Sequence, residues 1–310
     1  MSLVDTGMTA SEPIEAPRTM AETLRLYVDI TRPKVMALVV FTGLPALFLG
    51  KDVFPTPALA FWVLVGTAMA GGASSAFNAY IERDTDAFMA RTRNRPLPAA
   101  TVVPWAVLGW GAFLTVASSL VLFAVGGWTP VGVSLATIVF YVFAYTIYLK
   151  PRTPQNIVIG GAAGGTAPLI ASAAVDGSIS VGAWILFAII FLWTPPHFWA
   201  IAIVRKKEYA AAGLPMMPLV IGDQATRRQS LVYTVLLVAV SLLPVALGYL
   251  GSLYAILALA LGLWFTGTVV QSLRQQDPTV DWGVFKASIA YLSFLFFTML
   301  ADIAIPWGTP

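Results

Sequence analysis

The chain alternates long apolar stretches with short polar ones, and this alternation predicts its architecture. Crossing the hydrocarbon core of a bilayer takes a helix of about 20 mostly apolar residues. Nine windows approach or exceed that length, at residues 35–50, 57–80, 101–126, 129–148, 155–175, 180–204, 229–249, 252–272 and 285–305. The first window is short, and we expect its helix to begin a few residues earlier. The pattern predicts an all-α polytopic membrane bundle of about nine transmembrane helices.

The composition favours a lipid environment over water. Charged residues make up 11% of the 310 residues and hydrophobic residues 58%, whereas soluble domains carry roughly 25% charged residues. A soluble helical domain would need a polar face on most of its helices, and these windows lack one. The chain contains no cysteine, which excludes disulfides, thiol catalysis and metals held by cysteine.

The distribution of basic residues predicts the orientation in the membrane. Of the 18 lysines and arginines, all except Lys51 lie in the N-terminal segment or after even-numbered windows. The positive-inside rule then places the N-terminus in the cytoplasm and the C-terminus outside. Topology explains these basic patches, so no nucleic-acid partner is expected. Residues 1–26 are polar, acidic and proline-containing, and we expect a flexible cytoplasmic tail there, followed by one transmembrane domain over 27–310.

Two long cytoplasmic loops are predicted after the second and sixth windows. Both begin with charges at the end of an apolar helix, as "IERDTD" at 81–86 and "IVRKKEYAAAG" at 203–213, and both then run through prolines. The two sites are four helices apart. This spacing predicts a weak internal repeat of two four-helix halves plus one helix, with a site where the halves meet.

The end of the second window carries a stripe of oxygen-bearing side chains. Asn78, Glu82 and Asp86 are spaced four residues apart, so a continuing helix would place them on one face, whereas Asp84 would project elsewhere. Carboxylate and amide oxygens suit Mg²⁺, which commonly binds one or two carboxylates together with substrate phosphates. Asn78, Glu82 and Asp86 are therefore candidate metal ligands. With Asp84, they are also the candidate catalytic residues.

Three arginines follow this stripe, namely Arg91, Arg93 and Arg95. The arginine fork matches phosphate oxygens, so acids followed by arginines indicate a diphosphate site. Spacing alone leaves open a solvated helix end with internal salt bridges. Two features favour the site: Asn78 lies inside an apolar span, where a polar group is costly without partners, and the small residues "AGGASSA" at 70–76 allow close approach.

The segment "NAYIERDTDAFMARTRNRPLP" at 78–98 resembles the first acidic motif of the UbiA-type intramembrane prenyltransferases, which reads Asn, three residues, an acid, three residues, Asp. Within that family the chain is most similar to the branch that farnesylates protohaem IX. Matching blocks occur in the expected order at 30–49, 145–170, 193–203 and 206–220. The resemblance covers roughly residues 27 to 300.

The resemblance implies an enzyme of haem biosynthesis in a bacterial-type inner (cytoplasmic) membrane. Mg²⁺ would assist loss of diphosphate from farnesyl diphosphate, the 2-vinyl group of haem B would attack the resulting allylic cation, and water would complete the product, haem O. Haem B is then a substrate and not a permanent cofactor. A downstream haem-modifying enzyme or terminal oxidase assembly would be a partner, besides the lipid bilayer.

Further candidate substrate-binding residues lie nearer the middle of the chain. Lys150, Arg152 and Asn156, at the turn after the fourth window, would contact diphosphate or a haem propionate by the resemblance, although topology and helix capping also explain them. Pro151 and "GGTAPLIA" depart from the family's usual pattern here. His197, the only histidine, follows two prolines that should kink or unwind its helix. Its alternatives are haem contact and an ordinary hydrogen-bonded histidine.

The second loop contains one acid among several bases. Lys206, Lys207, Glu208 and Tyr209 follow Arg205, where the haem branch usually has Asp-Tyr in place of Glu208-Tyr209. One acid among three bases suits an anion better than a second Mg²⁺. We therefore expect the two lysines to bind an anionic substrate group with Glu208 orienting them, although topology alone could explain the lysines. The segment "AAAGLPMMP" at 210–218 is expected to form a lid-like turn.

Two other functions remain open on the sequence. A prenyltransferase acting on an aromatic quinone precursor would share the chemistry, but the scarcity of acids at 205–209 argues against it. An anion transporter would also place charges at a substrate site. Transporter sites commonly lie near the bilayer midplane on broken helices, whereas these acids are predicted at the cytoplasmic edge.

Overall fold

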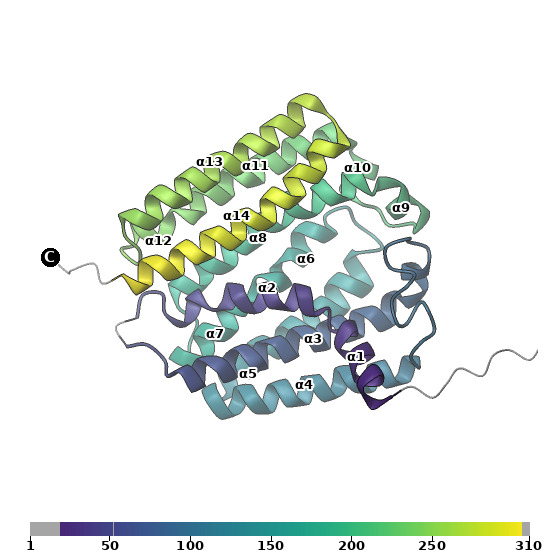
Figure 1. Ribbon diagram of the computed structural model, residues 1–310, viewed down its shortest axis with the longest axis horizontal. Helices are drawn as coiled ribbons and strands as arrows, with labels where there is room; N and C mark the ends of the chain where they lie inside the picture. Colours follow the sequence, from purple (N-terminus) through teal and green to yellow (C-terminus); the bar gives the residue numbers. More distant parts are fainter. Residues whose placement is uncertain (1–18, 52, 306–310) are drawn as a thin grey trace, which may run out of the picture.

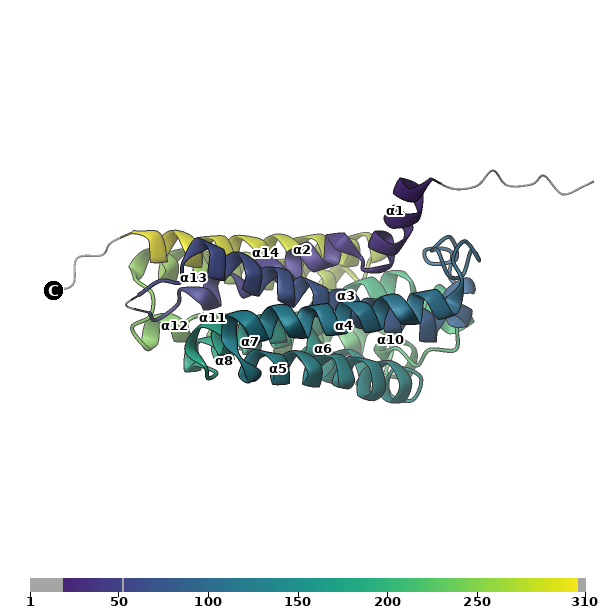
Figure 2. The same ribbon diagram turned by 90° about the horizontal axis from the view of Figure 1, so that it is seen from below.

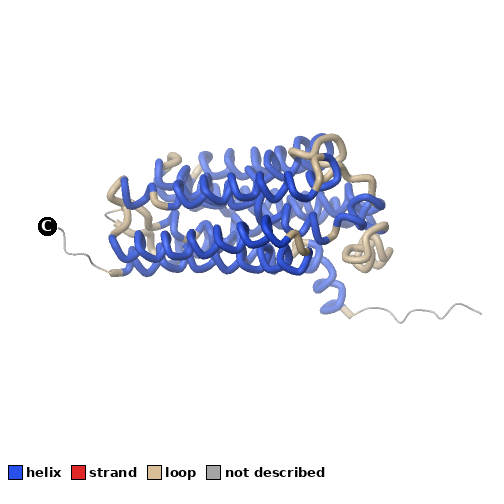
Figure 3. The backbone as a smooth tube through the Cα atoms, turned by 90° about the horizontal axis from the view of Figure 1, so that it is seen from above, coloured by secondary structure: helices blue, strands red, loops and turns tan. Residues whose placement is uncertain are grey.

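The computed structural model describes residues 19–51 and 53–305, and within those residues it consists of helices and loops, without strands (Figures 1 and 3). The helices are α1 (Met20–Ile30), α2 (Pro33–Gly43), η1 (Pro45–Leu47), α3 (Pro57–Ala87), α4 (Pro104–Gly126), α5 (Trp128–Val139), η2 (Phe140–Leu149), α6 (Asn156–Gly164), α7 (Thr166–Asp176), α8 (Val181–Val204), α9 (Lys206–Ala211), α10 (Met217–Val220), α11 (Asp223–Ser241), α12 (Leu243–Ala246), α13 (Ser252–Gln275) and α14 (Pro278–Ala304).

These elements confirm the predicted membrane bundle. In the described residues, eight spans are long and apolar enough to cross a bilayer, and the bent pair Met20–Ile30 and Pro33–Leu47 brings the number up to nine. Three of the eight combine two consecutive elements: α5 with η2, α6 with α7, and α11 with α12. The helix of the first apolar window, α2, begins at Pro33, two residues before the window, as expected.

The spans form two groups of four. In the first group α3 packs on α4, α4 on α5, and the α6–α7 span on both α5 and α3. In the second group α8, α11, α13 and α14 form a closed ring in which each contacts the next. Contacts of α6 and α7 with α8 join the groups, and α2 packs against α3 and α7 (Figure 1). This arrangement matches two halves plus one helix.

The N-terminal boundary differs from the expectation. Residues 1–18 of the predicted tail lie outside the described residues, but residues 20–26 belong to α1 and not to a flexible tail. Thr19 and Glu22 form a reciprocal capping box that starts this helix. An apolar stripe of Met20, Leu24 and Val28, spaced by four, remains exposed along α1. The helix bends by 56° from the one that follows and stands out from the bundle in Figure 2.

Buried carboxylates hold α14 in the second group. Near the start of α14, Asp281 accepts hydrogen bonds from Arg227 of α11 at 3.0 and 2.5 Å, and both side chains are almost fully buried. Near its end, Asp302 accepts from the backbone N–H groups of Gly251 and Tyr254 at the start of α13, where a helix has unsatisfied donors. Arg227 of α11 therefore has a packing role within the second group.

The two prolines before His197 do not unwind their helix. α8 continues without a break from Val181 to Val204 with Pro195 and Pro196 inside it. Of the two predicted effects, a kink or unwinding, the unwinding is therefore wrong. A proline removes one backbone hydrogen bond from a helix, but this segment is buried, and α6, α11 and α14 pack against α8. Tertiary packing therefore keeps the backbone helical.

Candidate functional site: a charged cluster at the end of α3

α3 continues well past the apolar window that begins it and ends only at Ala87. Asn78, Glu82 and Asp86 are consequently on one buried face, with exposed fractions of 1%, 8% and 2%. The side chain of Asp84 is 84% exposed on another face. The predicted common face is confirmed, and Asp84 lies apart from it.

The span formed by α5 and η2 supplies the partners of this face. The Asn78 side-chain amide donates to the Thr146 hydroxyl at 3.1 Å, and the Lys150 ammonium is ion-paired with Glu82. Both pairs are 68 residues apart in sequence, so the two spans run in parallel with matched four-residue steps. Thr146 in turn donates to the carbonyl of Tyr141, five residues earlier in the π-helix η2. The polar groups of the face thus have defined partners.

Two arginines complete the cluster. Arg95, in the loop after α3, donates to Asp86 at 2.8 Å, and Arg32, between α1 and α2, donates to the Asn78 side-chain oxygen at 2.7 Å. Arg32, Asp86 and Arg95 together line a pocket of about 40 Å³. Counting Lys150 and Glu82, three cations face two carboxylates. Burial and then the neighbouring charge of Arg32 lower the pKa of Arg95. This excess of positive charge in the cluster favours binding of an anion.

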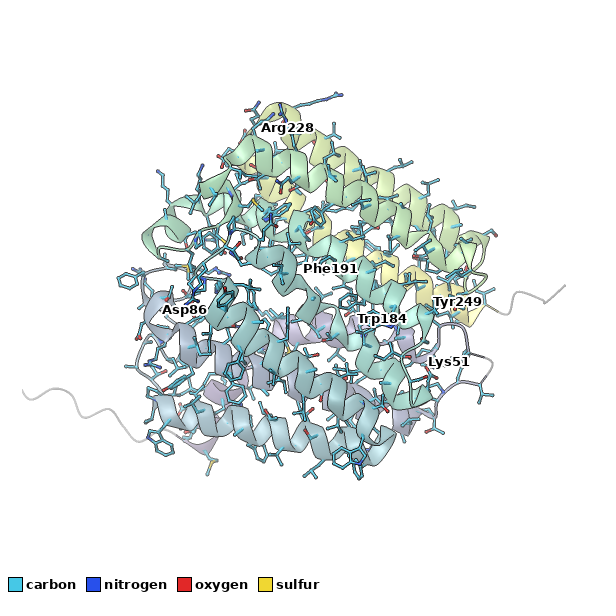
Figure 4. All side chains as sticks on the ribbon, turned by 180° about the vertical axis from the view of Figure 1, so that it is seen from behind. Lys51, Asp86, Trp184, Phe191, Arg228 and Tyr249 are labelled. Carbon is cyan, nitrogen blue, oxygen red and sulfur yellow. The ribbon has the colours of Figure 1, made fainter. Side chains whose placement is uncertain are left out.

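The other two arginines after α3 are placed differently. Arg91 and Arg93 are exposed, whereas Arg95 is half-buried. Of the three predicted phosphate ligands, the structure therefore brings only Arg95 to the acids. Asp86 lies at one end of the bundle and Lys51 at the opposite end (Figure 4), as the predicted segregation of charge requires.

At the turn after η2, the three candidates have different surroundings. Lys150 pairs with Glu82, as described. Arg152 is exposed, donates to the carbonyls of Ile147 and Tyr148, and stacks over the Tyr148 ring, which fits capping of η2. Asn156 begins α6 and is fully buried; within the described chain its side-chain oxygen has no hydrogen-bond partner. An unpaired buried acceptor is costly, so Asn156 remains a candidate ligand-binding residue.

The second loop has a different pairing from the expected one. Glu208 accepts from Arg205 at 2.6 Å, and Lys206 donates to Asp223 at 2.9 Å. Lys207 is exposed. Glu208 therefore does not orient the two lysines, because its partner is Arg205, three residues earlier at the start of α9, and Lys206 pairs with Asp223 at the start of α11. Binding of an anion by Lys206 and Lys207 stays a prediction.

Apolar packing brings the two predicted loops together. Tyr209 of α9 is buried in a cluster with Met89, which follows α3, and with Leu214 and Met217 from the second loop. Gly213, between α9 and α10, has φ +68°, a left-handed conformation that glycine adopts without steric cost, so the expected turn is present. The charged end of α3 and the second loop thus lie on the same side of the bundle (Figure 1).

With this geometry in view, comparison with known proteins identifies the family. The family model described as "UbiA prenyltransferase family" matches residues 39–299. The chain belongs to the UbiA prenyltransferase family. A relative from Rhodopseudomonas palustris (strain BisB5), named protoheme IX farnesyltransferase, is 43% identical over 98% of this chain and 97% of its own length. One of the same name from Gloeobacter violaceus is 42% identical over 92% of this chain and 94% of its own.

Solved UbiA structures share the fold at low sequence identity. A digeranylgeranylglyceryl phosphate synthase matches with a TM-score of 0.74 and 17% identity, covering 91% of this chain and 99% of its own. A UbiA homolog from Archaeoglobus fulgidus, bound to DMAPP and Mg²⁺, matches with a TM-score of 0.64 and 14% identity, covering 88% and 99%. These structural similarities show that the chain has the helical fold of those proteins.

His197 lies within the second group of helices of this UbiA enzyme. Its ring stacks between Trp193 and Phe285, and its Nδ1 lies 2.7 Å from the Ser288 hydroxyl. That hydroxyl donates its single proton to the Phe285 carbonyl at 2.6 Å, so it accepts from His197 and the Nδ1 carries the proton. The Nε2 of a neutral ring is then an acceptor. Haem contact by His197 stays a prediction.

Sequence reasoning missed two members of the cluster, Arg32 and Thr146. Thr146 could have been found from its spacing, because it precedes Lys150 by four residues, as Asn78 precedes Glu82. Arg32 is one of two basic residues in the "ITRPK" segment at 30–34, where the first apolar span begins. Its neighbour in space, Asn78, is 46 residues away in sequence, and no local pattern predicts that contact.

Proposed function

We propose that this UbiA-family enzyme transfers the farnesyl group of farnesyl diphosphate to the 2-vinyl group of haem B, which yields haem O and diphosphate. The observation that carries the proposal is the near-full-length relative, 43% identical, named protoheme IX farnesyltransferase. A prenyltransferase is an enzyme, so the transporter alternative is set aside. In the reaction the bond from farnesyl C1 to diphosphate breaks and a carbon–carbon bond to the vinyl group forms. Water supplies the hydroxyl group and loses a proton.

The donor set at the end of α3 suits a hard divalent cation. Glu82 and Asp86 offer carboxylate oxygens and Asn78 an amide oxygen, all on one buried face, and such oxygens favour Mg²⁺ over softer metals. The Archaeoglobus homolog of the same fold is bound to Mg²⁺ and DMAPP. We assign Asn78, Glu82 and Asp86 as the residues that would hold Mg²⁺. The ion would neutralise charge on the departing diphosphate.

The protein's own cations act on the same leaving group. Arg95 pairs with Asp86 and Lys150 with Glu82, so a diphosphate at the acids lies within reach of both cations. Fixed positive groups stabilise charge that develops as the carbon–oxygen bond breaks, and they need no reorganisation during the step. The apolar spans around the cluster limit access of water to the allylic cation.

We place the charged end of the bundle in the cytoplasm of a bacterial-type inner membrane. Seventeen of the 18 basic residues are predicted on this side, with Lys51 as the exception, which follows the positive-inside rule. The N-terminus is then cytoplasmic and the C-terminus outside. Haem O would pass from this enzyme to a haem-modifying enzyme or to terminal oxidase assembly.

A single assay tests the proposed function. Purified full-length protein in detergent or liposomes is incubated with farnesyl diphosphate, Mg²⁺ and haem B, and the haem is extracted for mass spectrometry. We expect a haem heavier by one farnesyl group and one hydroxyl group, together with released diphosphate. Unchanged haem, with prenylation of an added aromatic quinone precursor such as 4-hydroxybenzoate, would assign the alternative substrate instead.

Removal of divalent cations is expected to stop the reaction. Treatment with excess EDTA should lower haem O formation at least 100-fold, because uncompensated diphosphate is a poor leaving group and the proposed ligands are all oxygens. Mg²⁺ added back should restore the rate, whereas Zn²⁺ should restore less. The rate is measured by chromatography of extracted haem. Full activity after exhaustive chelation would disprove the metal assignment.

A further inference from the structure

Three successive residues of α1 show that this helix has three different sides. Tyr27 packs on Trp110 of α4, with ring centroids 5.6 Å apart, and belongs with Ile30 to an apolar cluster that joins α1 to α3 and α4. Val28 and Asp29, the next two residues, are both exposed. Each is rotated about 100° around the helix axis from the residue before it. The side that carries Val28 therefore lies between the side packed on the bundle and a charged side.

Both exposed sides extend along the helix. Met20, Leu24 and Val28 form an apolar stripe, with exposed fractions of 85%, 57% and 41%. Arg25 and Asp29 are exposed on the charged side. Residues four apart share a face of a helix, so the apolar stripe is continuous. Apolar side chains are unfavourable in water, so this stripe requires an apolar environment.

The contact with α4 places this part of α1 at the level of the bilayer surface. Trp110 lies six residues after Pro104, where α4 begins, which is about 9 Å along the helix axis. The exposed Trp105 lies close to the same end of α4, and tryptophan is enriched at membrane–water interfaces. Trp110 in turn stacks on Phe113, which is exposed on this membrane-spanning helix. The apolar surface of α1 therefore continues onto a surface that faces lipid.

We infer that α1 lies in the surface of the leaflet at the charged end of the bundle, with its apolar stripe among the lipid acyl chains and its charged side in water. α1 stands out from the bundle in Figure 2, so lipid can reach the stripe. Interfacial helices bury their apolar face about 5–10 Å into the boundary between headgroups and acyl chains, a depth that agrees with the level of Trp110. α1 contains Glu22, Asp29 and a single basic residue, Arg25. Apolar contact, and not attraction to anionic headgroups, therefore holds the helix in the leaflet.

The seat of α1 also affects the charged cluster. Asp29 and Ile30, near the end of α1, line the pocket together with Asp86 and Arg95. A leaflet that holds α1 in place therefore also holds one wall of this pocket.

Single labelled cysteines test the position of α1, because the chain contains no cysteine of its own. Full-length Leu24→Cys and Arg25→Cys, which differ by one residue, are each labelled with a small fluorophore and reconstituted into phosphatidylcholine vesicles. Phosphatidylcholine with a nitroxide on its acyl chain near the headgroup should quench the label at position 24 strongly. Aqueous iodide should quench that label roughly threefold less than the label at position 25, because the apolar face of an interfacial helix is buried below the headgroups. Added phosphatidylglycerol should leave both results unchanged.

Two further positions calibrate the quenchers. Leu120→Cys, on the exposed face of α4, reports contact with lipid, and Asp84→Cys, at the same end of the bundle as α1, reports contact with water. The inference is overturned if iodide quenches the label at position 24 as fully as the label at position 84, because α1 then lies in water. Protection of position 24 from both quenchers would also overturn it, since a second copy or another protein would then cover the stripe. These outcomes do not depend on which substrate the enzyme prenylates.

Discussion

Asp86→Asn is expected to lower the rate of farnesyl transfer by a factor of about 10²–10³, comparable to the loss of a preorganised group that stabilises transition-state charge. Asp86 is buried at the end of α3, and its carboxylate accepts from Arg95 at 2.8 Å. The amide keeps the shape of the side chain but removes the anionic oxygen that suits Mg²⁺. The rate is measured as haem O formed per unit of correctly inserted protein, at saturating substrates.

Asp84→Asn provides the comparison within the same helical turn. The side chain of Asp84 is exposed on another face of α3, with Arg83 as its ionic neighbour. We expect its loss of activity to be only a few-fold. Equal losses for Asp84→Asn and Asp86→Asn would show that net charge at the helix end matters, and not the buried face. Near-normal activity of Asp86→Asn would disprove the assignment of the metal ligands.

Lys150→Met is expected to cost stability as well as activity. The ammonium of Lys150 pairs with Glu82, and both side chains are largely buried. Removing one partner of such a pair leaves an uncompensated buried charge, which costs about 3–5 kcal/mol. We expect a clear fall in the thermal unfolding midpoint in detergent and a loss of haem O formation, because Lys150 also belongs to the proposed diphosphate site.

The double variant Glu82→Gln with Lys150→Met separates these two effects. Neutralising both members removes the buried charge, so the unfolding midpoint should recover much of the loss seen in Lys150→Met alone. Activity should not recover, because both the proposed metal ligand and the diphosphate contact are then missing. A double variant as unstable as Lys150→Met would mean that the unpaired charge of Glu82 does not cause the loss of stability, and recovered activity would contradict the roles assigned to both residues.

Local patterns predicted the fold and one face of the site. The length and apolarity of the windows predicted the spans, because backbone hydrogen bonds in lipid are satisfied within helices. The four-residue spacing of Asn78, Glu82 and Asp86 predicted their common face, because that spacing is a property of the helix itself. Their shared burial on α3 confirms it. The catalytic and metal roles of these residues stay proposals.

Partner choice could not be predicted in the same way. Glu208 pairs with Arg205 and not with the adjacent lysines, and Lys206 selects Asp223, because the geometry of α9 and α11 decides which charges meet. The contact of Arg32 with Asn78 joins different spans. Ten of the eleven residues from 193 to 203 are buried. They would have to lose this packing for the prolines to unwind α8, so tertiary contacts override a local signal there.

The π-helical stretch η2 makes the charged cluster sensitive to the length of the chain before it. Successive residues in an ordinary α-helix are rotated by about 100° around the helix axis. The ten residues of η2 before Lys150 instead form the wider π-helix. Loss of one residue from this stretch would let it relax toward the α form and turn Thr146 and Lys150 away from Asn78 and Glu82. A conservative replacement there leaves the alignment intact. In this span, therefore, we expect amino-acid substitutions to be tolerated better than insertions or deletions.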